Sequence, residues 1–408
     1  MSGVELGSSM KKECFHFQEE YTFVNHGSFG AVPLVIQEEQ KRLLEESNKN
    51  PDIFFRKREK ILYWEARDIA ANFLGAKPEH LVFVTNTTTG VNCVLRTLPW
   101  KKGDGILATN LTFPANVNAC HRAAEFSHGH FYQFEIRLPI RHEAEVVRNM
   151  TSYLDKFKNI RLVLLDHISS PTALVFPLKE MIAECRKRNV LVLVDGAHAL
   201  GQIAVNLEDL RPDFYIGNFY KWLYTPRGCA VLWVAGEHQT WCTPLVTSVM
   251  YREGFQLEFM MQGTRDNIPY YLVPASLKFF KDIGGMEKIN RYTVDLLERA
   301  CLLLEERLGT TCVGIPDSMK APRIRLVPLP QYEEYQATTD GAKQLNLDIM
   351  EKHNVICLVC AVQNHLYLRL SANIYNELSD YERLAEVLCE LRRPQITKKA
   401  IMLCKSKL

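Results

Sequence analysis

The chain has 408 residues, of which 47% are hydrophobic and 24% are charged, and its 49 Lys and Arg nearly balance 47 Asp and Glu. The length exceeds that of one ordinary hydrophobic core and therefore predicts two domains. The near-neutral charge, without a long basic block, argues against nucleic acid or an anionic membrane as the main partner and favours a small molecule.

From the N-terminus, apolar runs of strand length alternate with amphipathic stretches, which is typical of an α/β domain with a mainly parallel sheet. The expected strands are residues 81–85, 105–109, 161–165, 190–194, 214–216 and 230–234. The expected helices are residues 36–46, 61–74, 90–97, 114–125 and 178–188.

A composition shift near residues 269–274 is followed by a long helical pattern at residues 277–308. Strands at 323–327 and 366–370 and a helix at 381–392 then predict a smaller C-terminal domain. The expected organisation is an N-terminal arm of residues 1–35, a large domain of residues 36–270, a small domain of residues 271–402 and a tail of residues 403–408.

Residues that follow the strands are candidates for a site, because ligands in open α/β sheets bind outside the carboxyl ends of the strands. Thr87 and Thr88 follow the strand at 81–85, where hydroxyls and N–H groups at a helix N-terminus would meet a phosphate. A plain helix N-cap explains them equally well. Phe113 follows the strand at 105–109 and offers a ring to stack on an aromatic cofactor, although a Phe is more often part of the core.

The most informative signal is an apolar run at residues 190–194 that ends at Asp195, with Lys221 further along in an aromatic stretch. Pyridoxal phosphate chemistry requires an anion that keeps the pyridine nitrogen protonated and an amine for the Schiff base. Such a Lys must lie where burial or a neighbouring charge frees its lone pair. Taken singly, the two residues fit a turn Asp and a surface Lys, but together they predict a pyridoxal phosphate enzyme.

The cysteines and the last residues bear on the compartment. The twelve cysteines are scattered without a metal-ligand spacing, and no apolar segment precedes them, which indicates reduced intracellular thiols and no metal site. Ser406, Lys407 and Leu408 match the signal that the peroxisomal import receptor reads. We therefore expect a peroxisomal protein, with the cytoplasm as the alternative.

Six motifs occur in a set order along nearly the whole chain: Asn25-His26-Gly27-Ser28-Phe29-Gly30, Asn86-Thr87-Thr88-Thr89-Gly90, Val194-Asp195-Gly196-Ala197-His198, Asn218-Phe219-Tyr220-Lys221-Trp222, Gly263-Thr264-Arg265-Asp266 and Arg369-Leu370-Ser371. In this order they resemble class V aminotransferase-fold enzymes. The chain is most similar to the isopenicillin N epimerase-like branch, which includes cysteine desulfhydrases and hercynylcysteine sulfoxide lyases. The resemblance implies the pyridoxal phosphate-dependent transferase fold of aspartate aminotransferase (fold type I), with a mainly parallel seven-stranded sheet and a smaller α/β C-terminal domain.

The resemblance also implies roles for single residues around the cofactor ring. Lys221 forms the Schiff base and moves the substrate proton, and Asp195 pairs with the pyridinium. His198 matches a residue that hydrogen-bonds the cofactor's phenolic oxygen. Phe113 stands where relatives place a stacking ring, often a His, and a Phe takes no part in proton transfer.

Further roles concern the phosphate and a second subunit. The resemblance implies that Thr87 and Thr88 hold the phosphate and that Asn218 and Tyr220 complete the cup. Thr264 matches a residue that reaches into the phosphate site of the neighbouring subunit, which implies a homodimer with shared active sites.

The same motifs imply where a small amino-acid substrate binds. Arg369 matches the residue that clamps the substrate α-carboxylate, a task suited to a two-pronged guanidinium. Its alternative is a surface Arg on an edge strand. Asn25 and His26 belong to an N-terminal arm that lies over the site in relatives and are candidate substrate contacts.

The reaction is the least determined feature. Cysteine desulfurases of this fold use a mobile Cys, but Cys357 and Cys360 lie in an apolar stretch, where thiols are inert. We therefore expect β-elimination from cysteine or a cysteine S-conjugate or sulfoxide, such as hercynylcysteine sulfoxide, with residues 54–58 as a candidate recognition patch or a solvated helix start. Epimerisation or transamination is the first alternative, and cofactor binding without turnover is the second.

Overall fold

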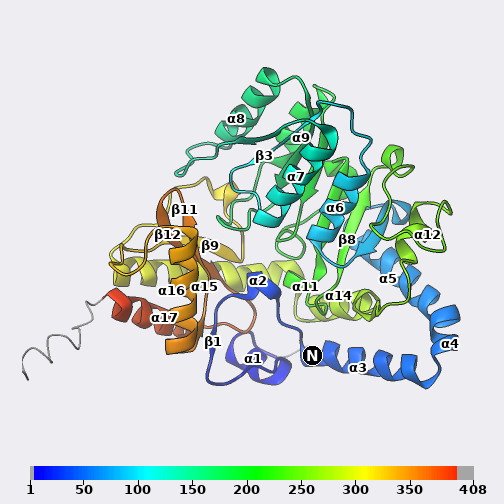
Figure 1. Ribbon diagram of the computed structural model, residues 1–408. Coiled ribbons are helices and arrows are strands. Elements are labelled where there is room, and N and C mark those ends of the chain that lie inside the picture. The colour runs from blue at the N-terminus through cyan, green and yellow to red at the C-terminus, as the bar shows by residue number, and fades with distance from the viewer. Residues whose placement is uncertain (1–3, 393–408) are drawn as a thin grey trace, which may run out of the picture.

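The computed structural model describes residues 4–392, and its central element is a seven-stranded sheet with the order β2-β8-β7-β6-β5-β3-β4 (Figure 1). Strand β8 runs antiparallel to both neighbours, and the other pairs are parallel. The strands are β2 (Leu81–Val84), β3 (Gly105–Thr109), β4 (Phe131–Phe134), β5 (Ile160–Asp166), β6 (Leu191–Asp195), β7 (Phe214–Asn218) and β8 (Ala230–Val234). The predicted fold class is confirmed.

The sheet is covered by helices on both faces, so its strands are apolar on both sides. Alternate residues divide between two cores: Val163 of β5 belongs to the same core as residues of α5 (Glu59–Phe73), and Leu162 belongs to the same core as residues of α6 (Thr87–Thr97). Helices α8 (Glu143–Lys156) and α9 (Leu178–Arg186) join the first core, and α7 (Pro114–Ser127) and α12 (Phe255–Met260) join the second. Continuous burial explains why the central strands were recognisable as uninterrupted apolar runs.

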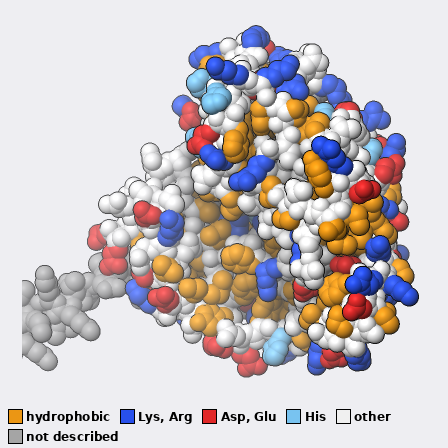
Figure 2. Space-filling model, turned by 45° about the vertical axis from the view of Figure 1, so that its right-hand side comes forward, with side chains coloured by type: hydrophobic (Ala, Val, Ile, Leu, Met, Phe, Trp, Pro, Cys, Tyr) orange, Lys and Arg blue, Asp and Glu red, His pale blue; other side chains and the backbone are white. Residues whose placement is uncertain are grey.

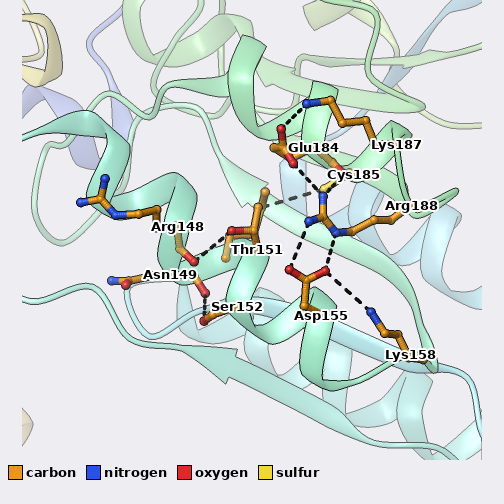
Figure 3. Close-up of polar contacts among 11 residues, drawn as sticks. Arg148, Asn149, Thr151, Ser152, Asp155, Lys158, Glu184, Cys185, Lys187 and Arg188 are labelled. Atoms are coloured by element: carbon orange, nitrogen blue, oxygen red, sulfur yellow. Dashed lines mark hydrogen bonds and ion pairs between the residues drawn. The ribbon is translucent and has the colours of Figure 1, made fainter.

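Helices α8 and α9 are also joined by a surface ion-pair network (Figure 3). Arg188 donates two hydrogen bonds to the Asp155 carboxylate, at 2.9 and 3.2 Å, and one to Glu184 at 2.7 Å. Lys158 lies 3.7 Å from Asp155, and Lys187 lies 2.5 Å from Glu184. Exposed pairs of this kind contribute only about 0.2–1 kcal/mol each, so the network has a local structural role.

The C-terminal part has a second core beneath a three-stranded antiparallel sheet with the order β11-β12-β9. The N-terminal segment reaches this part, because β1 (Thr22–Phe23) pairs in parallel with β10 (Val355–Ile356). The other elements here are β9 (Ile324–Pro328), β11 (Val359–Val362), β12 (His365–Ser371), α15 (Gly285–Leu308), α16 (Thr339–His353) and α17 (Leu378–Arg392).

The remaining elements are short or peripheral. They are α1 (Ser8–Cys14), α2 (His26–Phe29), α3 (Leu34–Lys49), α4 (Pro51–Ile53), a π-helical turn (Phe54–Arg58), α10 (Leu207–Leu210), α11 (Phe219–Trp222), α13 (Ile268–Tyr271), α14 (Val273–Asp282) and three 3₁₀ turns (Pro78–His80, Gly236–His238 and Asp317–Met319). Among residues 4–392, no helix is both long and apolar enough to cross a bilayer.

One predicted element was wrong and several were missed. The helix expected at residues 277–308 is two helices, α14 and α15, because Gly284 and Gly285 adopt φ values of 114° and 64°, which interrupt a right-handed helix. Strand β4 lies at the sheet edge and is partly exposed, so it lacks a long apolar run. Helices α8 and α16 were also missed. The domain boundaries at residues 35, 270 and 402 stay predictions.

Candidate active site

A cavity of about 440 Å³ lies at the carboxyl ends of β5, β6 and β7, between the large sheet and the C-terminal sheet. Figure 2 shows that this region of the surface is hollowed and that hydrophobic side chains surround the hollow. The predicted site residues that line the cavity are Thr87, Thr88, Phe113, Asp195, His198, Asn218, Tyr220, Lys221 and Arg369. The fold therefore brings together side chains from five separate parts of the sequence.

Lys221 lies in the short helix α11, directly after β7, and its amine points into the cavity. Nζ lies 2.9 Å from Nε2 of His198. Burial and the positive charge of Arg369 lower the pKa of Lys221 to about 7, against the opposing effect of Asp195. A large fraction of this amine is therefore neutral and nucleophilic near pH 7.

Asp195 ends strand β6 and is 5% exposed. Its carboxylate accepts hydrogen bonds from the N–H of Ala197 at 2.8 Å and from Nδ2 of Asn116 at 2.6 Å. Burial raises the pKa of Asp195, whereas these two donors and the charge of Lys221 lower it. The donors hold the carboxylate in a fixed orientation, and Asn116 is a functional residue that the sequence did not single out.

His198 is 1% exposed and shares the cavity wall with Lys221. Burial and the charges of Lys221 and Arg369 lower its pKa well below the ordinary value, so the ring is neutral. Nε2 of this neutral ring is within hydrogen-bond distance of the Lys221 amine, and the tautomer of the ring determines which of the two nitrogens donates. Nδ1 of His198 has no hydrogen-bond partner among residues 4–392.

The N-terminus of α6 forms a polar cup at the cavity. The side chain of Asn86 caps the helix by accepting the N–H of Thr89 at 2.8 Å, and Asn218 accepts the N–H of Thr87 at 3.0 Å. The buried hydroxyl of Thr87 has no partner in the described part of the chain. An orphaned hydroxyl at a helix N-terminus fits a phosphate.

Two other predicted contacts of the cofactor differ in their placement. Phe113 is the N-cap residue before α7, lines the cavity and is 43% exposed, so its ring is available to a ligand. Thr264 is exposed on the loop before α13 and does not line the cavity of its own chain. A role for Thr264 across a subunit boundary stays a prediction.

Arg369 supplies a buried positive charge on the opposite wall, from strand β12. Its guanidinium donates to the carbonyl and hydroxyl of Ser170 at 3.0 and 3.1 Å, to Ser28 at 3.0 Å and to Asn25 at 3.3 Å. It forms no ion pair within residues 4–392, and its Nε has no partner. Its 2% exposure excludes a surface Arg, and a buried cation held only by neutral groups suits an anionic ligand.

The structure places the two arm residues behind this wall. Asn25 contacts Arg369 and Ser28 but does not line the cavity. His26 is fully buried, and its ring nitrogens contact the Tyr375 hydroxyl at 2.7 Å and the carbonyl of Lys221. Both side chains therefore support cavity residues in this chain.

Gly30 holds the arm against the Lys221 segment. Its φ of 70° belongs to the left-handed region, and a Cβ there would lie 2.0 Å from the carbonyl oxygen of Tyr220. Only glycine combines this backbone angle with such a close approach.

Cys357, Cys360 and residues 54–58 do not line the cavity. Burial raises the pKa of Cys357 to about 12 and also raises that of Cys360. No cysteine of the described chain is among the lining residues, although Leu358 is. In the 54–58 segment, Phe54 is core and Arg56 pairs with Asp52 on the surface.

Comparisons with known proteins agree with this geometry. A family model described as aminotransferase class V matches residues 26–384. The chain is 28% identical to hercynylcysteine sulfoxide lyase of Schizosaccharomyces pombe, over 94% of this chain and 97% of that protein. It is also 28% identical to isopenicillin N epimerase of Streptomyces clavuligerus, over 90% of this chain and 93% of that protein. Among solved structures, a complex of a cystine C–S lyase with cysteine persulfide matches with a TM-score of 0.78 and 20% sequence identity. The match covers 91% of this chain and 98% of that chain.

Proposed function

The chain belongs to the class V aminotransferase family, whose members are pyridoxal phosphate enzymes, and on that premise we propose that it is a carbon–sulfur lyase. The proposed substrate is L-cysteine or a cysteine S-conjugate or sulfoxide such as hercynylcysteine sulfoxide. The 28% identity to hercynylcysteine sulfoxide lyase of Schizosaccharomyces pombe supports the sulfoxide as substrate.

The observation that carries the proposal is the placement of Lys221, Asp195 and Arg369 around one cavity. The cofactor fits this cavity: the cup of Thr87, Thr88, Asn218 and Tyr220 suits its phosphate, and Asp195 suits its ring nitrogen. Bound there, pyridoxal phosphate supplies an electron sink for the pair left when a Cα–H bond breaks.

The protein's own residues then divide the remaining work. Arg369 binds the substrate carboxylate and orients its Cα, because its fork matches two carboxylate oxygens. Lys221 takes the Cα proton at Nζ, for which a pKa of about 7 is well matched. His198 fixes the position of Nζ through the 2.9 Å contact.

Elimination is favoured over sulfur transfer because the cavity offers no acceptor thiol among the described residues. The Cβ–S bond breaks, the sulfur group leaves with the bonding electrons, and aminoacrylate forms. Water converts aminoacrylate to pyruvate and ammonia. Cysteine itself would release sulfide, and a sulfoxide would release a sulfenic acid.

Product analysis tests this proposal. The purified protein with pyridoxal phosphate is incubated with L-cysteine and with a cysteine S-conjugate sulfoxide, and pyruvate and ammonia are measured. Equal amounts of both products support the lyase. A racemised amino acid or a keto acid that retains sulfur would indicate the epimerase or aminotransferase alternative, and bound cofactor without any product would indicate a binding protein.

The depressed pKa of Lys221 predicts a pH dependence for capture of the cofactor by the apoprotein. Only the neutral amine attacks the aldehyde, so the capture rate is expected to rise about tenfold between about pH 6 and about pH 8, with a midpoint about pH 7. Stopped-flow absorbance measures this rate. A rise that begins only near the ordinary lysine pKa, about 10.4, would contradict the assignment.

We also propose that the protein forms a homodimer with shared active sites. Support comes from exposed apolar side chains in the segment that leads to Thr264, with Val246 at 50%, Val249 at 82% and Tyr251 at 55% exposure. Val249→Asp is expected to shift the dimer toward monomer and to weaken cofactor binding. Analytical ultracentrifugation with cofactor titration measures both effects, and a wild-type monomer with tight cofactor binding would exclude shared sites.

Peroxisomal import is a separate proposal that rests on Ser406, Lys407 and Leu408, which lie outside the described residues. A fluorescent protein fused ahead of residue 1 is expected to colocalise with peroxisomes, because the receptor reads a free C-terminal tripeptide. Removal of Leu408 is the matched control and is expected to leave the fusion in the cytoplasm. A cytoplasmic intact fusion would favour the alternative compartment.

A further inference from the structure

Asp166 is a second carboxyl group that lines the cavity, and no motif in the sequence singled it out. It ends strand β5, directly opposite Asp195 in the register of the parallel β5–β6 pair. Neighbouring strands lie about 4.8 Å apart, and residues in register project from the same face. The two carboxyl groups therefore stand side by side at one end of the cavity.

The contacts of Asp166 do not explain why a carboxyl group is buried there. Its side chain is 2% exposed and accepts one long hydrogen bond, from the hydroxyl of Thr112 at 3.4 Å. It forms no ion pair within the described chain. A buried carboxyl next to another carboxyl costs free energy unless a positive charge compensates it.

The electrostatic environment of Asp166 favours binding of a positive charge beside it. Burial and the negative charge of Asp195 raise the pKa of Asp166 well above its ordinary value. Both effects favour the neutral form of the Asp166 carboxyl group, and a positive charge placed beside the pair would oppose them. The titratable or charged groups around the pair are His167, Cys120, Tyr215, Tyr220, His198, Lys221 and Arg369.

We propose that Asp166 is a positioning residue of the cofactor site, which acts through Asp195 to keep the ring nitrogen of pyridoxal phosphate protonated. The inference rests on the cofactor assignment in the proposed function. A second carboxylate adds negative charge at the edge where Asp195 meets the ring nitrogen. A protonated ring is a better electron sink than a neutral one. By favouring the protonated ring, Asp166 would therefore assist the breaking of the substrate Cα–H bond.

The test is the protonation state of the ring nitrogen itself. The holoprotein is reconstituted with pyridoxal phosphate labelled with ¹⁵N in the ring, and the ¹⁵N chemical shift is followed across pH. In Asp166→Asn, the ring nitrogen is expected to lose its proton about 1–3 pH units lower than in the wild type, because a neighbouring opposite charge shifts a pKa by that amount. Asp166→Ser is a second neutral variant that is expected to give the same direction.

Asp209→Asn is the matched control, because it removes the same charge from the surface of α10. Its titration is expected to equal that of the wild type. Equal titrations of the wild type and both Asp166 variants would overturn the inference, even if the variants were less stable. Wild-type protein that binds no labelled cofactor would overturn the cofactor assignment. Failure to form pyruvate would contradict the lyase activity, but the ¹⁵N titration of the bound cofactor could still be measured.

Discussion

Replacing Lys221 with alanine is expected to lower kcat by at least about 10²–10⁴-fold, the contribution of one positioned acid–base group. The loss has two causes, because the amine both captures the cofactor and moves the Cα proton. The fold is expected to persist, since burial disfavours the charged form of this amine and Lys221 forms no ion pair within residues 4–392. Steady-state kinetics and thermal unfolding measure the two effects.

Lys281→Ala is the matched control, because Lys281 is exposed on α14 and lies outside the cavity. Its kcat is expected to equal the wild-type value. An added primary amine such as methylamine is expected to restore part of the activity of Lys221→Ala by accepting the Cα proton. Wild-type turnover in Lys221→Ala would exclude the assigned role.

Replacing Arg369 with methionine is expected to lower kcat/KM for amino-acid substrates roughly 30- to 5,000-fold. This corresponds to a loss of about 2–5 kcal/mol of transition-state binding, the cost of truncating one partner of a buried charge pair. The effect is expected mainly in KM, because the guanidinium binds a carboxylate that is present before and after reaction. Stability is expected to stay equal or rise, since this cation is buried without an ion pair among residues 4–392.

Arg369→Lys separates charge from geometry. Lysine keeps the positive charge but loses the fork that bonds Ser170, Ser28 and Asn25, so a partial loss is expected. Binding of a primary amine that lacks a carboxylate is expected to be equal in wild type and Arg369→Met. An equal loss for that amine would show that Arg369 acts on the fold of the cavity and not on the carboxylate.

The parts of the fold that were predictable are those that a local pattern determines. Strands such as β5 and β6 are buried on both faces, so each reads as one apolar run that ends at a polar residue. Helix α16 is less recognisable because it buries Asp348 among its apolar residues. The break between α14 and α15 depends on the backbone angles of Gly284 and Gly285, which a helical pattern does not reveal.

The site residues also divide into those that a local motif predicts and those that depend on the tertiary fold. Residues within recognisable motifs, such as Asp195, Lys221 and Arg369, were predicted to lie in one site, and the fold places all three at one cavity. Asn116 and Asp166 were missed because their importance arises from register and from helix α7, which bring them to Asp195. His26 belongs to a motif, yet its contacts with Tyr375 and Lys221 depend on how the arm folds back.

Several groups that line the cavity are in electrostatically unfavourable states. Burial lowers the pKa of Lys221 and of His198. Arg369 has no ion pair within residues 4–392, and the carboxyl groups of Asp166 and Asp195 lie side by side at one end of the cavity. Such perturbed groups gather at functional sites because ligand charges relieve them. The same arrangement connects the proposed roles of the cofactor, of the substrate carboxylate and of Asp166.

The most direct measurement is the pyruvate formed per substrate consumed, recorded together with the visible absorption of the bound cofactor. Purified holoprotein is mixed first with L-cysteine and then with a cysteine S-conjugate sulfoxide. A carbon–sulfur lyase gives a change in the cofactor spectrum and one pyruvate for each substrate molecule lost. A spectral change with substrate consumed and no pyruvate formed would contradict the account.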